Sequence, residues 1–165
     1  MRYMLDTNIF IYLATDVESL SRDIRAILQD YDNTFCVSAE TTRELIVGFR
    51  KHSFSRKTWK SSAEMLKSLE NEYFIEILPI DKSVAQQHAQ LQIDEAHGHN
   101  DPSDHIIIAH AISVKLPLIS SDTRFPFYRN QGLELIENKS STFAPEFFKK
   151  ICSPHPTYYL RIPPF

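Results

Sequence analysis

The chain has 165 residues, of which 42% are hydrophobic and 24% charged, a composition typical of one globular domain. No apolar run reaches the roughly 18–20 residues needed to cross a bilayer. The acidic Asp6 stands where a signal peptide would still be apolar, so we expect a cytoplasmic protein with no membrane association. The net charge of −3 argues against a broad basic surface for nucleic acid, but it is compatible with an acidic pocket that binds a cation.

Short apolar runs alternate with longer amphipathic segments, which is the pattern of an α/β fold with a parallel sheet. We expect five strands, at residues 3–5, 34–37, 74–78, 116–119 and 133–136. Helices are expected at residues 9–13, 19–30, 41–49, 55–72 and 82–96, and a buried helix from 101 to 112. Ser38 is the predicted N-cap after the second strand, and Asp101 followed by Pro102 predicts the start of the buried helix.

Two acidic residues follow predicted strands directly. Asp6 comes at the end of the first strand and Asp122 just after the fourth. In an open parallel sheet, ligands bind beyond the carboxyl ends of the strands, where the strand order reverses. The two positions therefore predict a shared site, although an aspartate after a strand can also simply cap the next helix.

Two further acids lie on predicted helices. Glu44 is nearly two turns into the helix that follows Ser38, where a lone glutamate is usually just solvated. Asp104 opens the buried helix and precedes three isoleucines, so its carboxylate should be paired or bound to a cation. Several carboxylates in one place suit a hard cation such as Mg²⁺ or Mn²⁺ better than zinc.

These acids occur in four motifs in a fixed order, and together the motifs resemble the PIN-domain family. Within that family the chain is similar to VapC, the toxins of type II toxin–antitoxin pairs. The resemblance covers about residues 1–138, and at the position after the third acid, where members often carry arginine, this chain has His105. The motifs are Asp6-Thr7-Asn8, Thr42-Arg43-Glu44-Leu45, Asp101-Pro102-Ser103-Asp104 and Ser120-Ser121-Asp122.

The resemblance implies a three-layer α/β/α fold with a central, mostly parallel five-stranded sheet, and a Mg²⁺- or Mn²⁺-dependent endoribonuclease. Its partners would be an RNA substrate, a cognate antitoxin and a second copy of the chain in a homodimer. The catalytic and metal-binding residues would be Asp6, Glu44, Asp104 and Asp122, with Thr7, Asn8, Asp101, Ser120 and Ser121 in accessory roles.

The chain then divides into a PIN-like nuclease domain at residues 1–138 and a C-terminal extension at residues 139–165. The extension is expected to contain a short helix at residues 142–151 followed by a proline-rich tail. Of the two cysteines, Cys36 is expected in the core, whereas Cys152 lies in the extension.

Other interpretations remain open at this stage. A PIN-like module without catalytic activity could bind RNA or protein, although all four acids are retained. A receiver domain or a haloacid-dehalogenase-like phosphatase would also use an acidic pocket, but the chain lacks their paired acids at the first strand. Trp59 and Phe54 are expected in the core rather than in a docking groove, and His88, His97, His99, His105 and His110 are expected to be structural.

Overall fold

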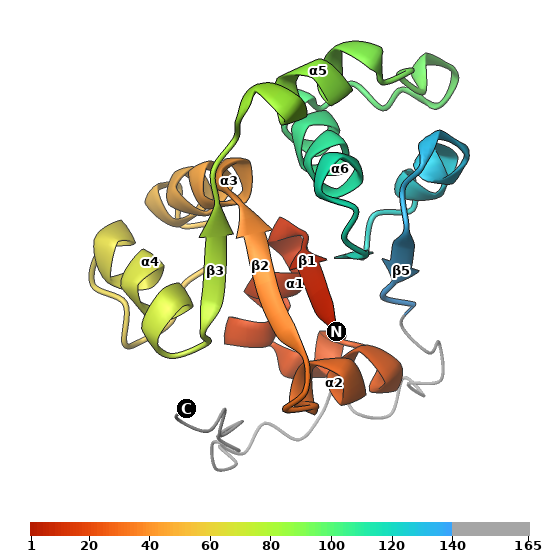
Figure 1. Ribbon diagram of the computed structural model, residues 1–165. Helices are drawn as coiled ribbons and strands as arrows, with labels where there is room; N and C mark the ends of the chain where they lie inside the picture. The colour runs from red at the N-terminus through yellow and green to blue at the C-terminus, as the bar shows by residue number, and fades with distance from the viewer. Residues whose placement is uncertain (140–165) are drawn as a thin grey trace, which may run out of the picture.

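The structure is a computed structural model that describes residues 1–139. Its centre is a five-stranded sheet in the order β3-β2-β1-β4-β5 (Figure 1), and all four strand pairs are parallel. The strands are β1 (Arg2–Leu5), β2 (Thr34–Ser38), β3 (Ile75–Leu78), β4 (Leu118–Ser120) and β5 (Leu135–Glu137). The α-helices are α1 (Thr7–Thr15), α2 (Arg22–Gln29), α3 (Ala39–Arg50), α4 (Ser62–Asn71), α5 (Lys82–Gln90) and α6 (Pro102–Val114), and the 3₁₀ helices are η1 (Val17–Ser19), η2 (Glu95–His97) and η3 (Phe125–Gln131).

The strand order confirms the expected α/β/α fold and shows where the sheet reverses. From β1 the chain moves outward through β2 to β3, then crosses back to β4 on the other side of β1 and continues to β5. The reversal lies between β1 and β4, which are joined where the Asp6 amide donates to the Ile119 carbonyl at 3.0 Å. The carboxyl ends of these two strands therefore form the crevice in which ligands of such sheets bind.

Alternating side chains of each strand build two hydrophobic cores, one on each face of the sheet. Tyr3 and Leu5 point into a core that α1, α2, α3 and α4 cover. Met4 points to the opposite face, where α6 and η3 complete the second core and α5 packs on α6. Helices on both faces explain why the strands are apolar on both sides.

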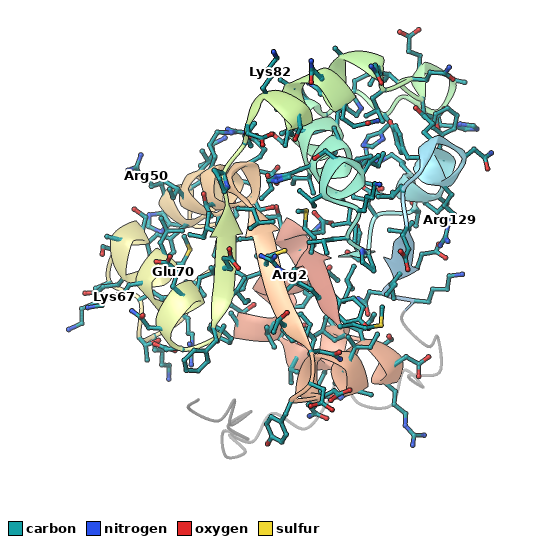
Figure 2. All side chains as sticks on the ribbon, viewed as in Figure 1. Arg2, Arg50, Lys67, Glu70, Lys82 and Arg129 are labelled. Carbon is teal, nitrogen blue, oxygen red and sulfur yellow. The ribbon has the colours of Figure 1, made fainter. Side chains whose placement is uncertain are left out.

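Helix α4 shows how its amphipathic pattern divides between core and solvent. Met65 and Leu69 are fully buried, whereas Lys67 and Glu70 are exposed and point outward (Figure 2). The prediction that this helix begins at residue 55 is wrong, because residues 55–61 form a loop and Ser61 accepts a hydrogen bond from the Glu64 amide at the true start.

The loop before α4 still contributes to the core. Trp59 is buried, and its ring lies 6.3 Å from those of Phe10 and Phe54. The prediction that Trp59 and Phe54 belong to the core is therefore confirmed. Trp59 has the spacing of an apolar residue of α4, so the sequence pattern extended the predicted helix into a segment that is irregular in the structure.

Other boundaries also differ from the predictions. Helix α2 begins at Arg22 after the N-cap Ser21, not at residue 19, and η3 was not predicted. Helix α5 ends at Gln90 rather than at residue 96, because Leu91 adopts an extended conformation. The N-caps predicted at Ser38 and Asp101 are confirmed by hydrogen bonds from the amides of Glu40 and Ser103.

Within residues 1–139, no helix is both long and apolar enough to cross a membrane. Cys36 is buried, as expected. The predicted helix at residues 142–151 and Cys152 lie outside the described residues, so the division into a domain at 1–138 and an extension at 139–165 stays a prediction.

Candidate metal centre

Asp6 lies at the carboxyl end of β1 and is 2% exposed. Its Oδ1 accepts a hydrogen bond from the Thr7 amide at 2.7 Å, so it caps α1. Its Oδ2 accepts a hydrogen bond from the Ser120 hydroxyl, also at 2.7 Å. The carboxylate is thus held from β1 and β4 at once, and both roles considered for Asp6, a helix cap and a member of a shared site, are compatible.

Glu44 on α3 and Asp104 on α6 extend the acidic cluster. Carboxylate oxygens of Glu44, Asp101 and Asp104 all lie within 4.8 Å of one another. Thr7 donates its hydroxyl proton to Oε2 of Glu44 at 2.5 Å, which links α1 to α3. Arg43 reaches across from α3 and donates to the Ser103 hydroxyl at 2.5 Å, so α3 and α6 are also joined beside the acids.

A second group of donors shares Asp104. Atoms of His99, Asp104 and Asp122 lie within 4.8 Å of one another, and each could supply one metal ligand. Asp6 also belongs to this acidic cluster, because its carboxylate interacts electrostatically with those of Asp104 and Glu44. The structure therefore brings the four predicted acids together from β1, α3, α6 and the turn after β4.

Burial and mutual repulsion make Asp6, Glu44 and Asp104 hard to ionise. Burial raises the pKa of Asp6 to about 7, with a further contribution from the charges of Asp104 and Glu44. Burial also raises the pKa of Glu44 and of Asp104, each with neighbouring carboxylates adding to the effect. A divalent cation would relieve this repulsion, and carboxylate oxygens are the donors that Mg²⁺ and Mn²⁺ accept. The residues present fit such an ion.

Arg124 is a member of the site that was not predicted. Its Nη2 forms ion pairs with Oδ2 of Asp122 and, at 3.3 Å, with Oδ2 of Asp104. Burial opposes ionisation of Asp122, but the hydrogen bonds and charge of Arg124 outweigh it and lower the pKa of that carboxyl. The sequence contains one local indication of this pairing. The Arg124 amide donates a hydrogen bond to the Asp122 carboxylate two residues earlier, as in an aspartate turn.

His99 was predicted to be structural, and the structure shows that it also contacts the acids. It is fully buried, and its Nε2 lies 3.0 Å from Oδ2 of Asp104. Its Nδ1 lies 2.9 Å from the Tyr128 hydroxyl on η3. His105 is buried as well, with Nε2 3.0 Å from the His99 carbonyl oxygen, so it contacts the backbone of His99.

The accessory residues differ in how they are held. Asp101 caps α6, as predicted, and also contributes to the first donor group. Ser120 is buried and bonded to Asp6. Asn8 is exposed, and within residues 1–139 the side chains of Asn8 and Ser121 make no hydrogen bond, so neither is fixed toward the acids.

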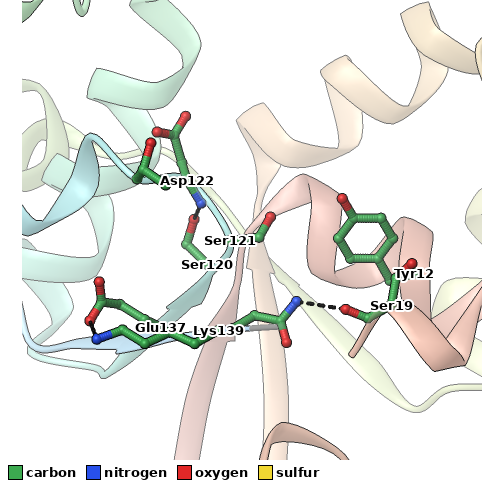
Figure 3. A pocket seen from close by; sticks show the side chains of 9 residues that line it. Tyr12, Ser19, Ser120, Ser121, Asp122, Glu137 and Lys139 are labelled. Atoms are coloured by element: carbon green, nitrogen blue, oxygen red, sulfur yellow. Dashed lines mark hydrogen bonds and ion pairs between the residues drawn. The ribbon is translucent and has the colours of Figure 1, made fainter. Parts of the chain in front are cut away.

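A cavity of about 410 Å³ opens beside Asp122 (Figure 3). It lies between α1 and the carboxyl ends of β4 and β5. Each of its lining residues carries a polar group, and the lining shares Ser120 and Asp122 with the acidic cluster. The lining residues are Tyr12, Ser19, Ser120, Ser121, Asp122, Thr123, Glu137, Asn138 and Lys139.

With this geometry in place, the comparison with protein families is decisive. The PIN domain profile matches residues 3–131, which is most of the chain and includes all four acids. The chain belongs to the PIN domain family. A PIN domain differs from a receiver domain or a haloacid-dehalogenase-like phosphatase, so those alternatives are set aside. No curated protein sequence matches the chain.

Solved structures with this fold include VapBC2 from Rickettsia felis bound to a promoter DNA fragment, at 22% identity and a TM-score of 0.62, covering 83% of this PIN domain chain and 98% of that one. VapBC-1 from nontypeable Haemophilus influenzae matches at 20% identity and a TM-score of 0.60, with coverage of 83% and 98%. VapBC-5 from Mycobacterium tuberculosis, of the VapBC family of toxin–antitoxin systems, matches at 27% identity and a TM-score of 0.54, with coverage of 82% and 98%.

Proposed function

We propose that this PIN domain is a metal-dependent endoribonuclease that hydrolyses RNA phosphodiester bonds. The observation that carries the proposal is the convergence of Asp6, Glu44, Asp104 and Asp122 from four separate segments into one cluster. Asp6 is buried and Glu44 and Asp104 are half-buried. Their carboxylates are costly to keep ionised without a compensating cation, so a bound divalent ion would stabilise the cluster.

Mg²⁺ or Mn²⁺ is the proposed cofactor. Glu44 and Asp104, with Asp6 directly or through water, would hold the principal ion, and Asp122 would complete that site or a second one. When bound, such an ion lowers the pKa of a water molecule and neutralises charge on the phosphate. Asp101 adds an oxygen at the edge of the same group.

The chain's own residues position these groups. Ser120 and the Thr7 amide fix the carboxylate of Asp6, and the Thr7 hydroxyl fixes Glu44. Among residues 1–139 the side chains of Asn8 and Ser121 have no hydrogen-bond partner, so they would be available to orient a substrate or a water once RNA is present. Arg124 supplies a positive charge beside Asp104 and Asp122, where a phosphate would approach.

The similar structures support a biological role as well. VapBC-5 from Mycobacterium tuberculosis belongs to the VapBC family of toxin–antitoxin systems, and we propose that this chain is the toxin of such a pair. Its partners would be a cognate antitoxin and a second copy of the chain, and it would act on RNA in the cytoplasm.

A cleavage assay tests the activity directly. Purified protein is incubated with a labelled single-stranded RNA and Mn²⁺ or Mg²⁺, with and without EDTA. We expect cleavage that EDTA and Asp6→Asn abolish. Asp23→Asn is the matched control, because Asp23 is an exposed acid on α2. Cleavage that persists in EDTA would refute the proposal.

The same assay separates the alternative of an inactive module. Such a module would bind RNA or a protein with no cleavage at any metal concentration. For the toxin assignment, the test is the neighbouring reading frame: its product should co-purify with this chain and suppress its cleavage of RNA.

A further inference from the structure

Most of the residues that line the cavity beside Asp122 take no part in the proposed hydrolysis. It begins where the acidic cluster ends, since Ser120 and Asp122 belong to both (Figure 3). Its volume of about 410 Å³ falls within the roughly 300–1,000 Å³ of small-molecule pockets. Because the cavity adjoins the acidic cluster, a polymer with one phosphate at the acids would have its neighbouring unit at the opening of the cavity.

The wall of the cavity is fixed by hydrogen bonds. Asn138, which is 8% exposed, accepts from the Ser21 amide at 2.7 Å and donates to the Ser19 carbonyl at 3.0 Å. These bonds tie the end of β5 to the segment between η1 and α2. The cavity is therefore built from two parts of the chain that hold each other in place.

Three hydroxyl groups on the lining are available to a ligand. Within residues 1–139, the hydroxyls of Tyr12, Ser121 and Thr123 make no hydrogen bond, whereas Ser120 is bonded to Asp6. Hydroxyls both donate and accept, so they suit a ligand that also does both. Tyr12 adds an aromatic ring whose other side packs on the core.

The charges on the lining select among ligands. Asp122 and Glu137 are acidic, and Lys139, which is exposed, pairs with Glu137 at 2.9 Å. Asp122 is paired with Arg124 and Glu137 with Lys139, so the charges of the lining are already compensated and offer a free phosphate little attraction. An uncharged group rich in hydroxyls and ring nitrogens fits the lining better.

We infer that this cavity binds one nucleoside of an RNA strand, next to the phosphate held at the acidic cluster; the inference rests on the proposed ribonuclease function. Tyr12 offers a ring against which a base can stack. Ser121 and Thr123, the sequence neighbours of Asp122, also line the cavity, and their hydroxyls would form hydrogen bonds to the ribose 2′-hydroxyl. The site would favour RNA over DNA of the same sequence, since only RNA has that hydroxyl.

Binding is measured by fluorescence anisotropy with a labelled short single-stranded RNA and the matching DNA, in the Asp6→Asn background so that no cleavage intervenes. We expect Tyr12→Ala to weaken RNA binding about tenfold, as loss of one stacked base does, and Tyr12→Phe to weaken it less. Ser121→Trp, which fills the cavity, should weaken binding as much. Tyr31→Ala is the control, since Tyr31 is 70% exposed outside the cavity.

The outcomes separate this inference from the nuclease proposal. Unchanged RNA affinity in folded Tyr12→Ala and Ser121→Trp proteins overturns the cavity as a nucleoside site, even if the parent chain cleaves RNA. If the parent never cleaves RNA but its RNA affinity depends on these residues, the nucleoside site holds and the nuclease proposal fails. If thermal unfolding shows that Tyr12→Ala does not fold, the inference is tested with Ser121→Trp and with the parent chain. Unchanged RNA affinity in Ser121→Trp and equal affinity of the parent chain for RNA and DNA would overturn it.

Discussion

Oγ of Ser38 lies 2.9 Å from Nδ1 of His110, and this contact joins the start of α3 to the middle of α6. The Ser38 hydroxyl already accepts a hydrogen bond from the Glu40 amide at 3.1 Å, so its proton is available to His110. Burial favours the neutral imidazole of His110, which can accept this proton at Nδ1. Two helices that carry site acids, Glu44 and Asp104, are thus linked by one buried histidine.

This arrangement predicts a loss of stability in acid. Burial lowers the pKa of His110 below its ordinary value of 6.5. The unfolded chain binds a proton near pH 6.5 while the folded chain resists it, so the contribution of His110 is complete above that pH and declines as the pH falls further. The urea concentration at the midpoint of unfolding should decrease from pH 8 through pH 6.5 to pH 5.5. The decrease should be smaller in the His110→Gln variant than in the parent protein. An equal decrease in both proteins would contradict the prediction; His88→Gln on α5 is the control.

Arg124 should compete with added metal. Its ion pairs with Asp104 and Asp122 occupy oxygens that a cation would use. We expect Arg124→Gln to tighten Mn²⁺ binding about fivefold, corresponding to roughly 1 kcal/mol for a partly exposed ion pair. Calorimetric titration with Mn²⁺ measures this without RNA. Arg129→Gln removes a similar ion pair, with Glu137, outside the acidic cluster and should leave Mn²⁺ affinity unchanged.

The chain of contacts from Tyr128 through His99 to Asp104 should contribute to stability. His99 is fully buried with both ring nitrogens in hydrogen-bond contact. Tyr128→Phe should cost about 1 kcal/mol, because it removes the contact with His99 and a long hydrogen bond from the Asp94 amide at 3.5 Å. His99→Ala should cost about 2–4 kcal/mol, because it also leaves a void and unpaired partners. Urea denaturation gives both values. Equal losses in the two variants would show that the imidazole contributes only through Tyr128.

Cys36 should be chemically silent in the folded protein. It is buried, and burial raises the pKa of its thiol to about 11, so the reactive thiolate is scarce at neutral pH. In a Cys152→Ser variant, we expect no reaction with a thiol reagent until the chain unfolds, and then one equivalent. Fast labelling of the native variant would show that this part of the sheet opens readily.

The sequence predicted the fold better than it predicted the site. Strand ends are marked by short apolar runs, so Asp6 and Asp122 could be placed at one edge of the sheet, and the family resemblance added Glu44 and Asp104. His99 and Arg124 could not be found in this way. The contacts of His99 depend on the irregular path of residues 91–101 and on Tyr128 of η3, where no periodic pattern exists. The ion pair of Arg124 with Asp104 joins residues 20 positions apart, which no local pattern indicates.

The helix boundaries illustrate the same limit on a smaller scale. Ser61 and Glu64 form a recognisable start for α4, since Glu64 also accepts a hydrogen bond from the Lys60 amide at 2.7 Å. The buried Trp59 extended the apparent apolar pattern past that start. A side chain that packs inward from a loop looks, in sequence, like part of the helix.

Asp104 belongs to both donor groups, the one with Glu44 and Asp101 and the one with His99 and Asp122. Two cations held there would draw on the same carboxylate and repel each other across it, so the first would weaken the second. Saturation with Mn²⁺ would then follow two unequal steps rather than a single hyperbola, and replacing Asp104 would remove both steps together.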